Sequence, residues 1–160
     1  MPVFGLNQGA MPLMGYNYGA RNKERLMRTY KLGLIVALVI MSFGVALFHL
    51  KPELFLLLFD ADENMLKMGV PALRRISLCF LPAAYGIMTS TLFQGTGHAI
   101  YSLFSSLIRQ LVGILPLAYV LFQLGGVELS WYSFPLAEIL GTTYLSIMLY
   151  RLYNREIKNL

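Results

Sequence analysis

The sequence has few charged residues for its length. Of its 160 residues, 13% are charged and 57% are hydrophobic, and the mean hydropathy is +0.60. A typical soluble domain is about 25% charged, because its outside must be covered with groups that water can solvate. This chain has too few such groups to cover its surface. A soluble globular domain is therefore excluded, and an integral membrane protein is predicted.

Cysteine and recognised catalytic motifs are also scarce or missing. Cys79 is the only cysteine, so the chain cannot form an internal disulfide or a thiolate metal site, and we expect this residue to be a small buried hydrophobe. The sequence has no glycine-rich phosphate loop followed by lysine, no HExxH and no GxSxG. It therefore predicts no enzyme and no cofactor, and it assigns no metal-ligand set.

What the sequence does have is long apolar runs. A helix needs about 20 mostly apolar residues to cross a bilayer, and four runs approach that length, at residues 33–50, 76–93, 107–124 and 129–150. Residues 1–20 are apolar too and predict part of a further membrane helix. The segment at 51–67 is too short to cross, and Pro52 suits a first helical turn, so we expect an interfacial helix there. The predicted fold is an all-α, polytopic transmembrane bundle.

The basic residues lie in a few short clusters between these runs, which predicts the orientation. Lys and Arg occupy five positions in residues 21–32 and three in residues 151–160, whereas residues 51–67 carry two against four acids. By the positive-inside rule, 21–32 is a cytoplasmic basic loop, 151–160 is a cytoplasmic tail, and 51–67 faces outward. The same clustering argues against a nucleic-acid partner. Arg74 and Arg75 fall on the outer side, where we expect them to reach lipid headgroups or the acids of the preceding loop.

The N-terminal stretch combines features of a helix that packs inside a bundle. Gly5 and Gly9 are four residues apart, as are Gly15 and Gly19, and small residues at this spacing let helix backbones approach closely in lipid. Pro12 removes a backbone hydrogen bond, which predicts a bend or break. The amides of this stretch need polar surroundings, which predicts a nearby polar cavity; they are Asn7, Gln8 and Asn17. Close helix packing without a ligand is the alternative.

Several motifs resemble one transporter family. "MPVFGLNQGAMPLMGYNYGARNKERL" resembles the signature at the end of the eighth helix of the multidrug and toxic compound extrusion (MATE) transporters. "LFQGTGHA", then "IRQLVGILPLAYVL" and "W..FPLAEIL", resemble the last three helices of that family, in the same order. The resemblance covers essentially the whole chain. It implies the end of helix eight through helix twelve of a twelve-helix protein with two pseudo-symmetric lobes and cytoplasmic termini.

The resemblance also implies a function. The parent would be a cation-coupled antiporter, driven by Na+ or H+, that exports drugs or other xenobiotics across the plasma (inner) membrane by alternating access. Expected partners are membrane lipid, a cationic or amphipathic small-molecule substrate, and the N-terminal lobe, which this chain lacks. A lipid-linked sugar flippase or polysaccharide exporter of the same superfamily is the alternative, and a small membrane scaffold is an alternative of another class. Substrate, coupling ion and the origin of the fragment stay open.

Two ionisable residues inside predicted spans are functional candidates, because a charge costs a few kcal/mol there. Glu138 is the only acid within a span, and it is either a protonatable or cation-binding group or the partner of a donor such as Arg109. We expect Arg109 to snorkel to the cytoplasmic interface and His98 to be a solvated turn residue. The remaining cavity candidates are Tyr85, Thr89 and Gln94, and the hinge candidates after Pro12 are Pro82, Pro116 and Pro135.

Overall fold

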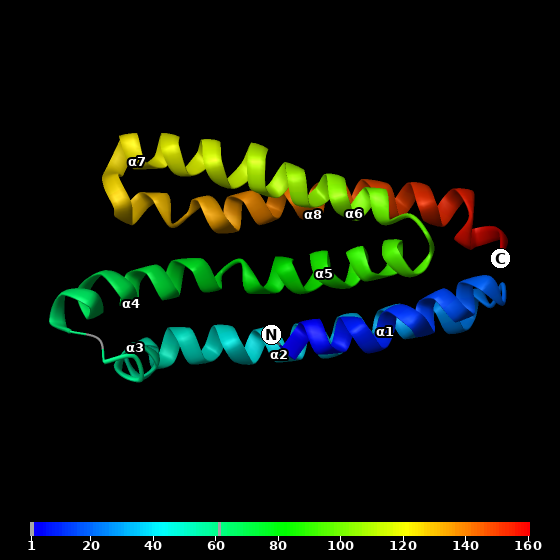
Figure 1. Ribbon diagram of the computed structural model, residues 1–160, viewed down its shortest axis with the longest axis horizontal. Coiled ribbons are helices and arrows are strands. Elements are labelled where there is room, and N and C mark those ends of the chain that lie inside the picture. Colours follow the sequence, from blue (N-terminus) through cyan, green and yellow to red (C-terminus); the bar gives the residue numbers. More distant parts are fainter. Residues whose placement is uncertain (1, 61) are drawn as a thin grey trace.

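The computed structural model describes residues 2–60 and 62–160, and helices account for nearly all of them (Figure 1). In chain order they are α1 (Pro2–Gly19), α2 (Lys23–Leu50), α3 (Pro52–Leu57), α4 (Glu63–Ser77), α5 (Phe80–Gly95), α6 (Ala99–Leu107), α7 (Leu115–Ser130) and α8 (Ser133–Arg155). A π-helix, η1 (Ile108–Ile114), joins α6 to α7, and a 3₁₀ turn, η2 (Ile157–Asn159), follows α8. No strand occurs in these two ranges, so the all-α prediction is confirmed.

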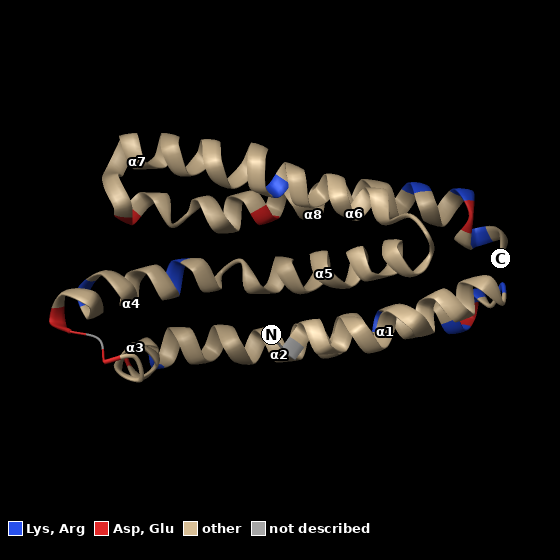
Figure 2. Cartoon of the chain, viewed as in Figure 1, with Lys and Arg blue, Asp and Glu red and all other residues tan. Residues whose placement is uncertain are grey.

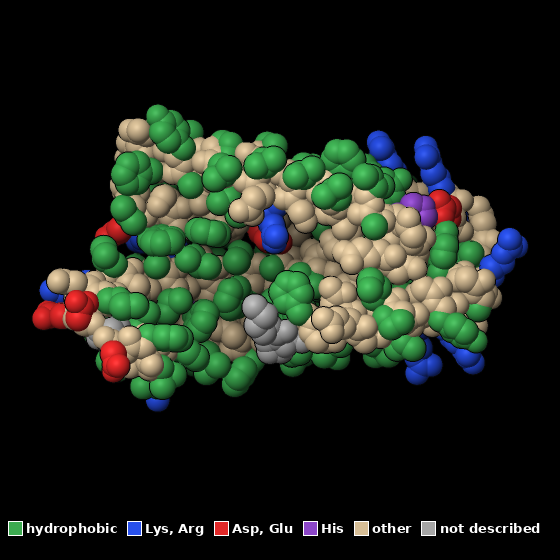
Figure 3. Space-filling model, in the orientation of Figure 1, with side chains coloured by type: hydrophobic (Ala, Val, Ile, Leu, Met, Phe, Trp, Pro, Cys, Tyr) green, Lys and Arg blue, Asp and Glu red, His purple; other side chains and the backbone are tan. Residues whose placement is uncertain are grey.

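The long helices lie side by side along the length of the molecule, with α5 at the centre (Figure 1). α5 packs against α1, α2, α6 and α8, and its Met88, Leu92 and Phe93 are fully buried. The outside is apolar as well: Val39 and Phe43 of α2 are 64% and 65% exposed, and hydrophobic side chains cover much of the face in Figure 3. An apolar exterior is costly in water and is expected where lipid is the solvent.

Two stretches of the described chain are long and apolar enough to cross a membrane. They are α2 and the run Ala99–Ser130, which contains α6, η1 and α7 and is kinked at Gly125 and Gly126. A third is the pair α4 and α5, if the two are counted as one span bent by 48°. The predicted fourth span corresponds to α8, which is long enough but is not among them by composition. Its crossing, like that of α1, stays a prediction.

The segment predicted as a basic loop at 21–32 is mostly helix. α2 begins at Lys23, ten residues before the predicted start, and the side chain of Asn22 accepts a hydrogen bond from the N–H of Arg25 at 3.0 Å. The expectation of a loop was wrong because the charge of a segment predicts contact with water but not its backbone conformation. Lys, Glu, Arg, Leu and Met, which begin α2, are all good helix formers. The cytoplasmic location of this segment stays a prediction.

Prolines coincide with some irregularities and not with others. The bend between α4 and α5 lies at Leu78 and Cys79, where Pro82 provides no N–H for the carbonyl of Leu78. Pro116 directly follows η1, at the start of α7. Pro12, in contrast, lies inside the continuous helix α1, so no break occurs there. Pro135 is in the first turn of α8, where the missing N–H has no cost.

The glycine prediction for α1 holds at one position. A Cβ at Gly15 would lie 3.0 Å from the carbonyl oxygen of Gly95, and one at Gly95 would lie 2.9 Å from that of Met11. These two glycines therefore allow α1 and α5 to pack backbone to backbone. A Cβ at Gly5, Gly9 or Gly19 would meet no described atom within 4 Å. No described residue packs closely at those three positions, where close helix packing stays a prediction.

Charges gather at the two ends of the bundle (Figure 2). Lys and Arg of the α1–α2 connection and of the C-terminal segment share one end, and most acids share the other. At the acidic end, the guanidinium of Arg75 lies 3.0 Å from the carboxylate of Glu128. The partner of Arg75 is therefore an acid of α7, and neither a lipid headgroup nor an acid of residues 51–67 was needed to explain its position.

Candidate functional site

A single ion pair lies about midway between the charged ends (Figure 2). Nη1 of Arg109 lies 3.2 Å from Oε2 of Glu138, and it joins η1 to α8. The Glu138 side chain is 9% exposed and that of Arg109 is 40% exposed. Arg109 is the only described residue that donates a hydrogen bond to this carboxylate, and its own buried Nε has no partner.

Two glycines and a π-helix shape the surroundings of this pair. Gly86 of α5 faces the carboxylate, and a Cβ there would lie 3.3 Å from Oε1 of Glu138. Gly113 lets η1 approach α8, since a Cβ at Gly113 would lie 2.6 Å from the Cβ of Ala137. The π-helix that carries Arg109 has the wider turn often found at functional sites. The carboxylate, the guanidinium and the local backbone are therefore fitted to one another.

The ion pair lines a polar cavity of about 300 Å³ that opens on the face shown in Figure 3. Small hydroxyl and amide side chains line it together with the ion pair. The lining residues are Phe4 and Asn7 of α1; Gly86, Ile87, Ser90 and Gln94 of α5; Ser105 and Ser106 of α6; Arg109; and Glu138 and Leu145 of α8. The cavity thus combines one anion, one cation and neutral hydrogen-bonding groups with a few apolar walls.

Three of the predicted cavity residues line this cavity: Asn7, Gln94 and Glu138. The sequence analysis did not identify Gly86, Ser90, Ser105 or Ser106, which lie beside them. The cluster of serines in "SLFSSL" was a usable signal, because Ser102, Ser105 and Ser106 fall within two turns of one helix.

The other predicted cavity residues have partners elsewhere. Thr89 is buried, with its hydroxyl 2.9 Å from that of Tyr30 on α2. The hydroxyl of Tyr85 lies 2.9 Å from that of Ser146 on α8. Asn17 donates to the carbonyl of Leu13 in its own helix at 2.7 Å, and Gln8 is exposed outside the cavity lining. These four residues lie outside the described cavity.

Two expectations about charged residues, those for Arg109 and His98, were wrong. Arg109 does not extend to an interface, because it pairs with Glu138 inside the bundle. His98 is not simply solvated: its Nε2 lies 3.1 Å from Oε1 of Glu156, and its ring stacks on that of Tyr101. Gln94 lies in the last turn of α5, which ends at Gly95, and Gly97 in the following turn has a positive φ of 83°.

Glu156 connects the first and last helices at the basic end. The hydroxyl of Tyr18 on α1 donates to its Oε2, and His98, which precedes α6, lies against its other oxygen. The hydrogen bond from Tyr18, and then the proximity of His98, hold the pKa of Glu156 below its ordinary value of 4.5. The carboxylate is thus stabilised in its charged form. No group of three or more His, Cys, Asp or Glu that could hold a metal ion occurs in the described ranges.

Comparison with known proteins gives the same family on several counts. The MatE family profile matches residues 1–120. The chain is 24% identical over 153 residues to the multidrug export protein MepA of Staphylococcus haemolyticus, covering 96% of this chain and 33% of that protein. It is 25% identical over 154 residues to a probable multidrug resistance protein, NorM, of Thermotoga maritima, covering 94% of this chain and 32% of that protein.

A solved structure is similar over the full length of the chain. The MATE multidrug transporter DinF-BH is 33% identical, with a TM-score of 0.86, and the match covers 100% of this chain and 35% of that one. The chain therefore spans about a third of the length of the relatives that it matches.

Proposed function

Because the chain belongs to the MatE family, we propose that it forms part of the C-terminal lobe of an export transporter. The intact transporter exports drugs or other xenobiotics across the plasma (inner) membrane, and inward movement of Na+ or H+ drives this export. The observation that carries the proposal is the ion pair of the buried Glu138 with the partly exposed Arg109, in a polar cavity of a bundle with an apolar exterior. Its relatives MepA and NorM are described as multidrug export and resistance proteins, which supports the substrate class.

Glu138 is the coupling group in this proposal. Its carboxylate has one oxygen on Arg109, and the other lies near the position of Gly86 without a described donor. A proton or Na+ that binds to the carboxylate competes with Arg109 for the same negative charge. Binding of the coupling cation then releases the guanidinium and changes how η1 packs against α8. This exchange connects cation binding to a movement of helices.

The cavity walls suit an amphipathic substrate. Phe4, Ile87 and Leu145 supply apolar and aromatic contacts, while the serines, Asn7 and Gln94 supply hydrogen-bonding groups without net charge. Adaptable walls of this kind bind bulky molecules without a fixed set of hydrogen bonds. A second lobe completes the site, and alternating access follows from rocking of the two lobes around it.

The test uses the intact parent transporter in proteoliposomes. Glu138→Gln keeps the side-chain volume and removes the negative charge, so we expect dye export per folded transporter to fall at least tenfold and to lose its dependence on the cation gradient. Rates are measured at two pH values, each with and without Na+. Glu128→Gln is the matched control, because it also removes a carboxylate paired with an arginine, but at the acidic end.

The outcomes separate coupling from a structural role. A rate per folded Glu138→Gln transporter that equals the normal rate under all four conditions, with a lower folded yield, would make Glu138 only a structural partner of Arg109. Loss of the cation dependence in Glu138→Gln but not in Glu128→Gln would assign coupling to the pair in the cavity.

A further inference from the structure

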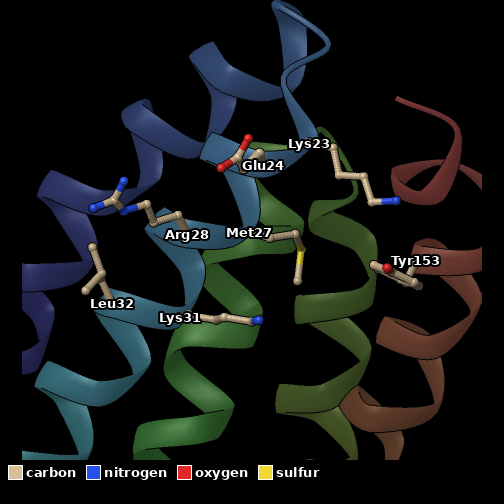
Figure 4. Close-up of a pocket in the computed structure, with 7 residues that line it drawn as sticks. All are labelled: Lys23, Glu24, Met27, Arg28, Lys31, Leu32 and Tyr153. Carbon is tan, nitrogen blue, oxygen red and sulfur yellow. The ribbon is translucent and has the colours of Figure 1, made fainter.

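A second concave surface lies at the basic end, on α2 and α8, away from the candidate site. It is a groove of about 820 Å³ lined by Lys23, Glu24, Met27, Arg28, Lys31 and Leu32 of α2 and by Tyr153 of α8. Figure 4 shows Lys23, Met27 and Lys31 on the side of α2 that faces Tyr153, with Arg28 and Leu32 directed toward α1. Three cations and one acid therefore surround an apolar floor.

The cations of this groove are not neutralised by carboxylates. None of the ion pairs formed by the described residues includes Lys23, Arg28 or Lys31. Lys23 instead donates to the carbonyl oxygen of Lys158 at 3.2 Å, and its Nζ lies 5.4 Å from the centre of the Tyr153 ring. The groove is thus electropositive, and its charge is available to an anion.

An apolar groove continues from the cationic one. It has a volume of about 510 Å³, lies between α1 and α2, and shares Leu32 with the cationic groove. Its remaining residues are Gly5, Leu6, Gly9, Ala10 and Leu13 of α1 and Thr29, Gly33 and Val36 of α2. Gly5 and Gly9 keep it open, since a Cβ at either would meet no described atom within 4 Å.

We propose that these two grooves bind one acidic phospholipid, with its anionic headgroup in the cationic groove and one acyl chain between α1 and α2. Charge complementarity selects the anion, and the apolar groove that begins at Leu32 selects a ligand with a hydrocarbon chain. Basic pockets at the end of membrane helices are the usual sites for anionic headgroups. Glu24, at the edge of the groove, accepts a headgroup hydroxyl and repels a second anion.

This site is independent of the proposed transport activity, and all of its lining residues lie within the 160-residue chain. The purified chain is titrated in detergent with phosphatidylglycerol, phosphatidylcholine or phosphatidylethanolamine, and bound lipid is counted by native mass spectrometry. We expect preferential retention of phosphatidylglycerol that weakens with added salt. Lys31→Gln and Arg28→Gln should each weaken it roughly fivefold, as expected for one cation near a headgroup.

Matched variants separate the headgroup from the chain. Arg25→Gln removes a cation from the same helix outside the groove, and it should leave retention unchanged. A Cβ at Gly9 meets no described atom within 4 Å, so Gly9→Leu is designed to place a bulky apolar side chain in the groove. It should abolish phosphatidylglycerol retention but leave any binding of glycerol 3-phosphate intact. Circular dichroism confirms that each variant remains helical.

Three results would overturn the proposal: equal retention of the three lipids, an effect of Arg25→Gln as large as that of Lys31→Gln, or unchanged lipid retention in Gly9→Leu. Equal retention of the three lipids means no headgroup selection, and the Arg25 result means a diffuse charge effect. If glycerol 3-phosphate displaces phosphatidylglycerol and the acyl chain adds nothing to binding, the groove is instead a site for a soluble phosphate.

Discussion

At the scale of single residues, the Arg109–Glu138 ion pair is the contact whose disruption should cost the most stability. Two opposite charges removed from solvent stabilise each other, but each is costly if the other is removed. The buried Nε of Arg109, which lacks a partner, shows that the pair is not fully satisfied by its surroundings. The pair therefore contributes to the free energy of unfolding because each charge compensates the other. This contribution can be measured only with variants that change both residues.

Arg109→Met is expected to lower the free energy of unfolding by about 3 kcal/mol, because it leaves the Glu138 carboxylate buried without its cation. Adding Glu138→Gln to Arg109→Met should restore most of this loss, since the buried charge is gone. Thermal unfolding of the single and double variants in one detergent provides the double-mutant cycle. Additive effects of the two substitutions would show that the pair is not energetically coupled.

In α5 the sequence identified Gln94 correctly as a cavity residue but also selected two residues from another face of the helix. Tyr85 and Thr89 were expected in the cavity, whereas Gly86 and Ser90 line it. A displacement of one residue turns a helix by about 100°, and the orientation of α5 depends on packing against α1, α2, α6 and α8, which one sequence does not reveal. Asn7 and Gln8 illustrate the same limit on α1. Glu138 was identifiable because a lone acid in an apolar run is rare.

At the scale of secondary-structure elements, α2 is longer than a bilayer requires. Its 28 residues extend about 42 Å, compared with a hydrocarbon core of roughly 30 Å. Residues 32–50, which follow the last cation of the cluster, already extend about 28 Å. We therefore expect residues 23–31 to extend as a helix into the headgroup region, where they would hold Arg28 and Lys31 at a fixed depth.

The π-helix is the element that sequence reasoning could not predict. Apolar periodicity predicts a helix over residues 107–124 but does not distinguish a π turn from an α turn. Pro116 was a partial signal, since its missing N–H frees the carbonyl of Val112 within η1. Gly113 was a second signal, visible only once its contact with Ala137 is known.

Gly113→Ala is expected to destabilise the bundle by about 1–3 kcal/mol, as overpacking does. The added methyl would lie 3.0 Å from the Cα of Ala137, which is backbone and cannot rotate away. Thermal unfolding and labelling accessibility of η1 report the change. Gly5→Ala is the matched control and should be neutral or slightly stabilising, because its methyl meets no described atom and alanine favours the helix. Equal stability of the two variants would contradict a close η1–α8 contact.

At the scale of the whole molecule, the separated charges predict which end faces the cytoplasm. Cysteine substitutions are made in a Cys79→Ser background to remove the native thiol. Asp62→Cys should react with a membrane-impermeant maleimide added from outside, and Lys23→Cys should react only after the membrane is permeabilised. The reverse pattern would invert the orientation and place the lipid groove in the outer leaflet.

The hydrogen bond from Tyr18 to Glu156 joins α1 to the end of α8, and we predict that its contribution to stability depends on pH. The pKa of Glu156 is lower in the folded chain than its ordinary value of 4.5. Its stabilising contribution is therefore fully present above about pH 4.5 and is lost as pH falls through the folded pKa. Tyr18→Phe should lower the unfolding midpoint by about 2–4 °C at pH 7, corresponding to roughly 1 kcal/mol.

The difference between Tyr18→Phe and the unmodified chain should shrink to zero in acid, where Glu156 is protonated in both. Tyr16 is two residues away and 74% exposed. Tyr16→Phe should therefore show the same dependence of the unfolding midpoint on pH as the unmodified chain. A constant difference from pH 7 to pH 3 would show that the Tyr18 hydroxyl acts through packing instead of through the carboxylate.

The paired charges in the middle of the bundle also have an electrical consequence. Arg109 and Glu138 together carry no net charge, so a movement of the lobe that carries the pair across the membrane field does no electrical work. If Glu138 takes up a proton, the same pair becomes a unit positive charge. Moving that charge across the whole field is worth about 2.3 kcal/mol for each 100 mV. The loaded and unloaded halves of such a cycle would therefore respond differently to voltage, and the membrane potential would act mainly on the half-cycle that moves the proton.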